Sequence, residues 1–174
     1  MNKNRPFQEA WEWIKTLVFS IILALLINLV IQPTIVKGES MHPTLENRDL
    51  VITLKIAYLH SEPKQGDIII FKPALDDKIY IKRVIGGPGD KVAIKGGHVY
   101  VNNQLLKEHY ISTNYTEGDI DLTVPEGKVF VLGDNRWPSA SLDSRSSMLG
   151  LVSLDAILGK TVYRIFPIVK IGNL

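Results

Sequence analysis

The 174-residue sequence contains no cysteine, which excludes disulfide bonds and thiolate metal sites. It also has no strong excess of one charge, because 20 lysines and arginines are balanced by 18 aspartates and glutamates. Nucleic-acid binding requires a concentrated basic surface, so we expect no nucleic-acid partner. The four histidines form no pair at helical spacing with an acid between them, and we therefore expect neither a metal nor a cofactor.

One long apolar run lies near the N-terminus. Residues 16–36, TLVFSIILALLINLVIQPTIV, carry no charge, and about 20 such residues span the core of a bilayer. A cleaved secretory signal is the alternative, but its apolar region is usually only about 7–15 residues long, and no small-x-small cleavage site follows here. We therefore expect an uncleaved anchor in a lipid bilayer. Pro33 disfavours helix at Gln32, so the helix should end there and the chain should continue extended.

The rest of the chain alternates short apolar segments with turn residues. Strands are predicted over 67–71 and 80–85, and 91–106 reads as a meander with Gly-Gly and Asn-Asn turns. Within 124–135 a Pro-Glu-Gly turn precedes another strand. Residues 154–169 predict one helical turn followed by a last strand. No long amphipathic helix is predicted outside the anchor. The sequence therefore predicts a single, mostly β domain after one N-terminal transmembrane helix.

A serine stands in a turn directly after the anchor, in the stretch GESMHPTL. Ser40 lies between Gly38 and Pro43, where a turn can expose a hydroxyl and leave backbone N–H groups free to bind an oxyanion. The hydroxyl is inert until a base removes its proton. Taken alone, a turn serine is more often structural, and a catalytic role requires a base from elsewhere in the chain.

The candidate base is a lysine in the segment YIKRVI. Period-two alternation places Tyr80, Lys82 and Val84 on one face of a strand. Burial beside such groups disfavours the ammonium, lowers the lysine pKa and makes a neutral amine available as a general base. The alternative is an exposed lysine on an edge strand, whose stem lies over its neighbours.

A polar segment, GDNRWPSASLDSR, covers residues 133–145. It is either a solvated loop or a hydrogen-bonded network that supports a site. In the second case Asp143 and Arg145 pair, while neighbouring serines orient an amine.

These segments, in this order, resemble the bacterial type I signal peptidases, the leader peptidases of the S26 serine protease family, in their short, single-anchor, Gram-positive form. The resemblance covers nearly the whole chain: SMHPT, GDII, YIKRVIGGPGD, GDNR and DSR. It implies coiled antiparallel sheets and a membrane-bound endopeptidase that removes signal peptides from secretory preproteins after small-x-small sites. It also implies Ser40 as the nucleophile and Lys82 as the general base.

The resemblance further implies a set of residues that support the site or shape the substrate cleft: Met41, Pro43, Tyr80, Asp134, Ser141, Asp143 and Arg145. Two departures from the family pattern matter. Gly38 stands where some members carry a serine that serves the oxyanion hole, so backbone N–H groups or another donor must act here. The segment between Arg136 and Asp143 has two extra residues. Counting back from Asp143 selects Ser141 as the serine that contacts the lysine, and counting forward from Arg136 selects Ser139; we favour Ser141.

The expected organisation is a cytoplasmic tail over 1–13, a transmembrane anchor over 14–33 and an extracytoplasmic catalytic domain over 34–174. Three basic residues lie on each side of the anchor, so the charges do not fix its orientation, which follows from the resemblance. Two alternative functions are a catalytically silent, membrane-tethered β module that binds exported proteins, and a self-cleaving Ser/Lys protease.

Overall fold

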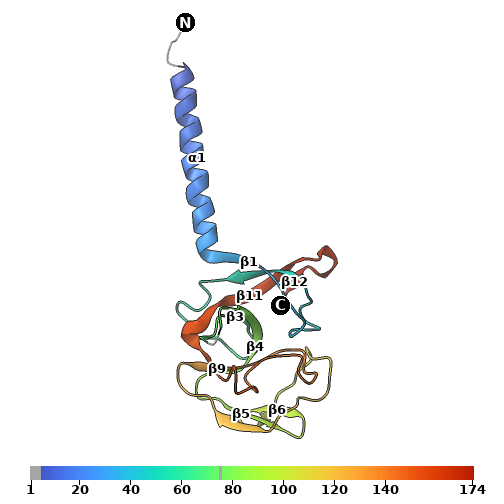
Figure 1. Ribbon diagram of the computed structural model, residues 1–174. Helices are drawn as coiled ribbons and strands as arrows, with labels where there is room; N and C mark the ends of the chain where they lie inside the picture. Colours follow the sequence, from blue (N-terminus) through green and yellow to red (C-terminus); the bar gives the residue numbers. More distant parts are fainter. Residues whose placement is uncertain (1–4, 75) are drawn as a thin grey trace.

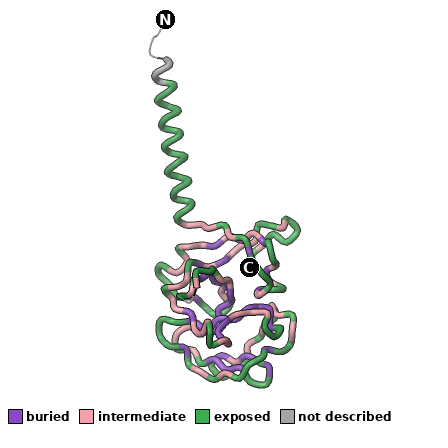
Figure 2. Tube along the Cα trace, in the orientation of Figure 1, coloured by how far each residue is buried: buried purple, intermediate pink, exposed green. Residues whose placement is uncertain are grey.

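The structure of the chain is a computed structural model that describes residues 5–74 and 76–174. One long N-terminal helix stands away from a β domain (Figure 1). The helix, α1, runs from Arg5 to Val30, and its stretch Glu9–Val30 is exposed along its length (Figure 2). Its length and apolar composition are sufficient to cross a membrane.

Pro33 predicted that the helix would end at Gln32. The helix ends two residues earlier, at Val30. Ile31–Ile35 forms strand β1, which pairs antiparallel with β2 (Leu50–Leu54), so that the backbone there bonds to a neighbouring strand instead of the preceding helical turn. Lys55 caps the helix, because its amide donates to the Val30 carbonyl over 2.9 Å and its Nζ to the Asn28 carbonyl over 2.7 Å. The last residues of the expected anchor therefore belong to the first strand of the domain.

Most of the domain is one curled, eight-stranded antiparallel sheet. Its order is β1-β2-β11-β3-β4-β9-β10, and β12 pairs with β11. β1 is an edge strand, and β11 is the long central strand that joins β2 to β3. The remaining strands of this sheet are β3 (Ile68–Phe71), β4 (Tyr80–Gly86), β9 (Lys128–Leu132), β10 (Val152–Ser153), β11 (Ile157–Phe166) and β12 (Gly172–Asn173).

A second sheet has four strands in the order β7-β6-β5-β8 and lies at the end of the domain far from α1 (Figure 1). The meander predicted over residues 91–106 is confirmed, because these residues form three successive antiparallel strands of this sheet. Gly96 and Gly97 make the first turn with φ values of +58° and +83°, a conformation that favours glycine. The strands are β5 (Lys91–Lys95), β6 (His98–Val101), β7 (Gln104–Leu105) and β8 (Ile120–Thr123).

The core lies on both faces of the larger sheet, as β9 illustrates. Phe130 and Leu132 pack into a cluster shared with β5 and β6, whereas Val129 and Val131 pack on the other face with Ile69. The predicted helical turn near the C-terminus is also confirmed, as the 3₁₀ helix η1 (Leu154–Ala156) directly before β11. A second 3₁₀ helix, η2 (Ile168–Lys170), lies between β11 and β12. The fold is therefore the predicted one, mostly β with coiled antiparallel sheets behind one N-terminal helix.

Candidate active site

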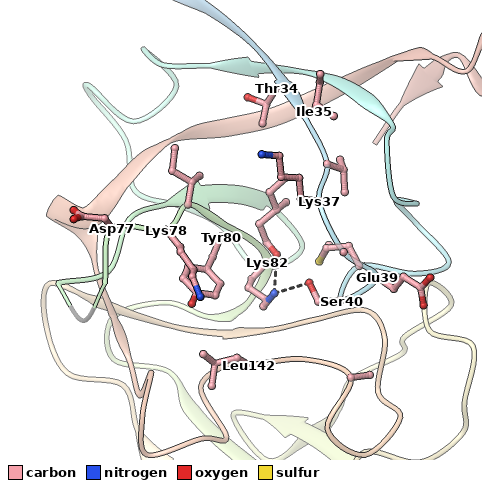
Figure 3. A pocket seen from close by; sticks show the side chains of 16 residues that line it. Thr34, Ile35, Lys37, Glu39, Ser40, Asp77, Lys78, Tyr80, Lys82 and Leu142 are labelled. Atoms are coloured by element: carbon pink, nitrogen blue, oxygen red, sulfur yellow. Dashed lines mark hydrogen bonds between the residues drawn. The ribbon is translucent and has the colours of Figure 1, made fainter.

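A cleft of about 660 Å³ opens between two distant parts of the chain (Figure 3). One wall is the segment Thr34–Met41, which continues from β1, and the other is Asp77–Lys82, which leads into β4. Ala140 and Leu142 border it from the loop after β9. The lining is mainly apolar, and Ser40 and Lys82 are among its polar residues.

The amine of Lys82 meets the hydroxyl of Ser40 within this cleft. Lys82 Nζ donates to Ser40 Oγ over 2.7 Å and to the carbonyl of its neighbour Ile81 over 3.1 Å (Figure 3). The lysine is buried, with 2% of its surface exposed, and its Nζ lies 5.8 Å from the centre of the Tyr80 ring. The alternation in YIKRVI thus places Lys82 beside Tyr80 as expected, and the alternative of an exposed edge-strand lysine is wrong.

The surroundings of Lys82 change its protonation. Burial lowers its pKa from 10.5 to about 8, although the charges of Asp143 and Asp134 act in the opposite direction. A substantial fraction of this amine is therefore neutral at mildly alkaline pH and can accept a proton. The hydroxyl of Ser40, 2.7 Å from the amine, is close enough to give up this proton.

Several contacts hold the turn that carries Ser40. The Asn135 amide donates to the Ser40 carbonyl over 3.0 Å, and Asn135 Nδ2 donates to the Glu39 carbonyl over 3.0 Å. Met41 is 1% exposed and packs with Leu45 in an apolar cluster below the turn. Gly38 has φ = +89°, so the bend just before the serine uses a conformation that glycine adopts readily.

The same turn is also bound to β11. Arg164 Nη1 donates to the Thr44 carbonyl over 2.8 Å and to Asp49 Oδ2 over 2.9 Å. Asp49 Oδ2 in turn accepts the Glu46 amide over 3.0 Å. The loop after the serine is therefore fixed at both of its ends, which limits the movement of Ser40.

Two ion pairs lie behind the cleft. Arg83 binds Asp134 in a bidentate manner, with Nε–Oδ1 of 2.9 Å and Nη2–Oδ2 of 2.7 Å, and it also stacks 4.0 Å from the Tyr110 ring centre. Arg145 binds Asp143 through two 2.9 Å hydrogen bonds. Burial raises the pKa of Asp143, but the hydrogen bonds and charge of Arg145 outweigh burial and hold it below its usual value. Both carboxylates are therefore paired with an arginine behind the cleft.

The structure places the expected supporting residues at different depths. Met41 and Tyr80 line the cleft, and Tyr80 donates its hydroxyl to Asp76 over 2.9 Å. Pro43 is exposed in the turn and lies outside the cleft lining. Asp134 and Asp143 lie behind the cleft, each paired with an arginine.

The two candidate serines differ in their surroundings. Ser141 Oγ is buried close to Asp143 and makes no hydrogen bond of normal geometry, with Lys82 or any other described residue. Ser139 is exposed, with φ = +61°. Only Ser141 lies in the interior of the site.

Sequence reasoning missed three residues that shape the site: Arg83, Gly133 and Asn135. Arg83 follows Lys82 in the segment YIKRVI, and spacing alone does not pair it with Asp134. Gly133 and Asn135 stood in the quoted GDNR segment without a role of their own. Among residues 5–74 and 76–174, no group of three or more histidines and carboxylates could hold a metal ion.

Comparisons with known proteins identify the family of the chain. A family model described as signal peptidase, peptidase S26, matches residues 10–166. Signal peptidase I of Bacillus licheniformis is 38% identical over 168 residues, covering 90% of this chain and 89% of that protein. Signal peptidase I P of Bacillus subtilis subsp. natto is 39% identical over 181 residues, covering 96% of each chain. A crystal structure of a signal peptidase I from Enterococcus faecalis V583 aligns with a TM-score of 0.51 at 35% identity, covering 57% of this chain and 97% of that one.

Matches of this extent define the protein as a serine endopeptidase, a hydrolase of peptide bonds. Within that class the chain belongs to the signal peptidase family, peptidase S26, whose serine proteases remove signal peptides. The resemblance in the sequence motifs is thereby confirmed.

Proposed function

We propose that this protein cleaves secretory preproteins with a Ser40/Lys82 dyad, after small-x-small sites at the outer face of a membrane. The observation that carries the proposal is the 2.7 Å contact between Lys82 Nζ and Ser40 Oγ inside an apolar cleft. Burial holds the pKa of this lysine near 8, which suits a general base more than a structural ion.

In the first step the neutral amine of Lys82 accepts the proton of Ser40 Oγ as the oxygen attacks the scissile carbonyl carbon. The tetrahedral oxyanion collapses, the peptide C–N bond breaks, and the Lys82 ammonium gives its proton to the leaving amine. An acyl-enzyme on Ser40 remains. Water then attacks the ester carbon, and the same amine takes its proton. The ester C–O bond breaks, the Lys82 ammonium returns a proton to Ser40 Oγ, and the signal peptide leaves with a new carboxylate.

The oxyanion requires donors close to Ser40. The Ser40 amide makes no hydrogen bond within the described residues, so it is free to bind the oxyanion. Gly38 supplies no hydroxyl, and its own amide donates to Asn47 Oδ1 over 3.2 Å. The oxyanion hole is therefore assigned to backbone donors, with the Ser40 amide as the first.

The preprotein binds as an extended strand against the free edge of β1. Among the strands of the described residues, β1 pairs only with β2, and its residues Thr34–Ile35 line the cleft together with Val36 and Lys37. Addition of a strand to such an edge provides backbone hydrogen bonds, while side-chain pockets select the residues. The apolar walls on either side, with Ile81 and Leu142, favour small uncharged side chains next to the scissile bond.

The location proposed is a membrane crossed once by α1, with the tail 1–13 in the cytoplasm and the domain from 34 onward outside. Ile31–Ile35 runs directly from α1 along the helix side of the domain (Figure 1). An apolar surface continues from it, since Ile35, Leu50 and Phe166 are partners across three neighbouring strands, and Ile168 and Val169 at the hairpin tip are 75% and 90% exposed. Contact of this surface with lipid would hold the cleft close to the bilayer.

The test is cleavage of a purified precursor by the full-length protein in detergent. Ser40→Ala and Lys82→Ala are each expected to abolish the defined cut, while Lys128→Ala, which changes an exposed lysine on β9, leaves it intact. Circular dichroism confirms that each variant keeps its β domain. A Lys82→Ala variant that cuts at a normal rate would overturn the dyad. Failure of the unaltered protein to cut would favour a silent binding module, and cleavage of its own chain alone would favour a self-cleaving protease.

A further inference from the structure

The hydroxyl of Thr34 lines the cleft but has no part in the proposed reaction. It lies on β1, at the end of the cleft away from the dyad (Figure 3). Thr34 Oγ1 is buried and has no hydrogen-bond partner, a property that it shares, among the described residues, only with Ser141 Oγ. A buried donor or acceptor without a partner is unfavourable, and native proteins retain few of them.

The other hydroxyls of the cleft are all paired. Ser40 Oγ accepts the Lys82 amine, and the Tyr80 hydroxyl donates to Asp76. A valine would have nearly the same shape as Thr34 and would suit the neighbours Ile35 and Val36 without leaving a polar atom unpaired. The packing of the free protein therefore does not account for the hydroxyl, whereas a group that enters the cleft could satisfy it.

We infer that Thr34 determines specificity, and that its hydroxyl forms a hydrogen bond with a hydroxyl or amide side chain of the bound signal peptide. This inference rests on the proposed binding of the preprotein along β1. A signal peptide that runs parallel to β1 approaches Ser40 with its residues upstream of the scissile bond, and these residues therefore lie beside Thr34. Neighbouring strands lie about 4.7–4.9 Å apart, within reach of a hydrogen bond between two short side chains. The backbone groups of the substrate strand form hydrogen bonds with the backbone of β1. The group left to bond with the Thr34 hydroxyl is therefore the substrate side chain that faces it.

The position of the contact follows from the period of a strand. Val36 follows β1 directly and continues its pairing, since its amide donates to the Asp49 carbonyl over 2.8 Å. Thr34 and Val36 are two residues apart and point to the same side, so their substrate partners also lie two residues apart. The residue that faces Thr34 is the one farther from the scissile bond, because Val36 is closer to Ser40 along the chain. Rotation about the Cα–Cβ bond of Thr34 exchanges Oγ1 with Cγ2 and turns the hydroxyl toward this residue.

The experiment compares peptide substrates in which each residue upstream of the scissile bond is in turn alanine or serine. The full-length protein in detergent should prefer serine at one position by about tenfold in kcat/KM, the size of one added hydrogen bond. Thr34→Val should bring the ratio of serine to alanine rates at that position to about one, and Thr34→Ser should keep the preference. These ratios compare two substrates with the same enzyme, so a general loss of activity leaves them unchanged.

A stability measurement separates this role from a structural one. Thr34→Val removes an unpaired hydroxyl and should leave the thermal midpoint unchanged or higher. Thr161→Val is the matched control in the same sheet, because Thr161 Oγ1 lies 3.3 Å from Thr53 Oγ1, and its loss leaves a buried hydroxyl unpaired and lowers the midpoint. Two results would overturn the inference: no upstream preference for serine in the unaltered protein, or an equal effect of Thr34→Val on both substrates. If the unaltered protein cuts no peptide, the proposed function fails instead.

Discussion

The backbone amide of Asn135 donates a 3.0 Å hydrogen bond to the carbonyl oxygen of Ser40 and so joins the loop after β9 to the turn after β1. Gly133 lies beside this bond, and a Cβ atom added there would overlap both Ser40 O and Ser141 Oγ. The close approach of two loops, and not an unusual φ, is therefore what requires glycine at this position.

Gly133→Ala is expected to push the Ser40 turn away from Lys82. Since small displacements of reacting groups are costly, the rate of preprotein cleavage should fall by about a hundredfold. The measurement is kcat/KM on a precursor, together with a thermal midpoint to show that the domain still folds. Gly172→Ala is the control, because no atom lies within 4 Å of its added Cβ, and it should retain full activity. Equal activity of the two variants would contradict the role of Gly133.

The pH dependence of the reaction should report Lys82. The neutral amine is the active form and burial sets its pKa to about 8, so kcat/KM should rise with pH up to this value and level off above it. Asp143 raises the pKa of Lys82 by its charge, and Asp143→Asn should therefore shift the midpoint of the profile to lower pH. Asp121→Asn, an exposed carboxylate bound to Lys91 and Lys95, should not move it. A flat profile, or a midpoint that rises in Asp143→Asn, would count against this assignment.

The Arg83–Asp134 pair should contribute strongly to folding. Asp134→Ala leaves the guanidinium of Arg83, which is 7% exposed, without its carboxylate, and the loss of one partner of a buried pair costs about 3–5 kcal/mol. Urea unfolding of the full-length protein in detergent, followed by circular dichroism, measures this loss. Asp121→Ala breaks an exposed pair and should change the unfolding midpoint little. A similar midpoint for both variants would contradict the prediction.

The serine that assists Lys82 can be identified by substitution. Ser141 is buried beside the ion pair of Asp143, whereas Ser139 is exposed, so Ser141→Ala should lower kcat and Ser139→Ala should not. The effect of Ser141→Ala should include a shift of the pH profile, because Ser141 borders Asp143, whose charge acts on the pKa of Lys82. A lower kcat in Ser139→Ala alone would select the other serine.

Local patterns in the sequence predicted much of the architecture. The uncharged run predicted the N-terminal helix, the Gly-Gly turn predicted the meander of β5 and β6, and the alternation in residues 80–85 placed Lys82 beside Tyr80. The motifs also identified the family, and each of these signals depends only on residues close together in the chain. The end of α1 was predicted two residues too late, because pairing of β1 with the distant β2 overrides the local effect of Pro33.

The sequence by itself determined the kind of protein, several of its strands and, through its motifs, the two residues of the proposed dyad, since periodicity and motif spacing are local properties. Only the tertiary structure decided that Ser40 and Lys82 lie 2.7 Å apart, that Arg83 neutralises Asp134, and that Thr34 faces the cleft without a partner. These relationships join residues many positions apart. They depend on which strands pair and on which side chains that pairing removes from water, and no single stretch of sequence contains that information.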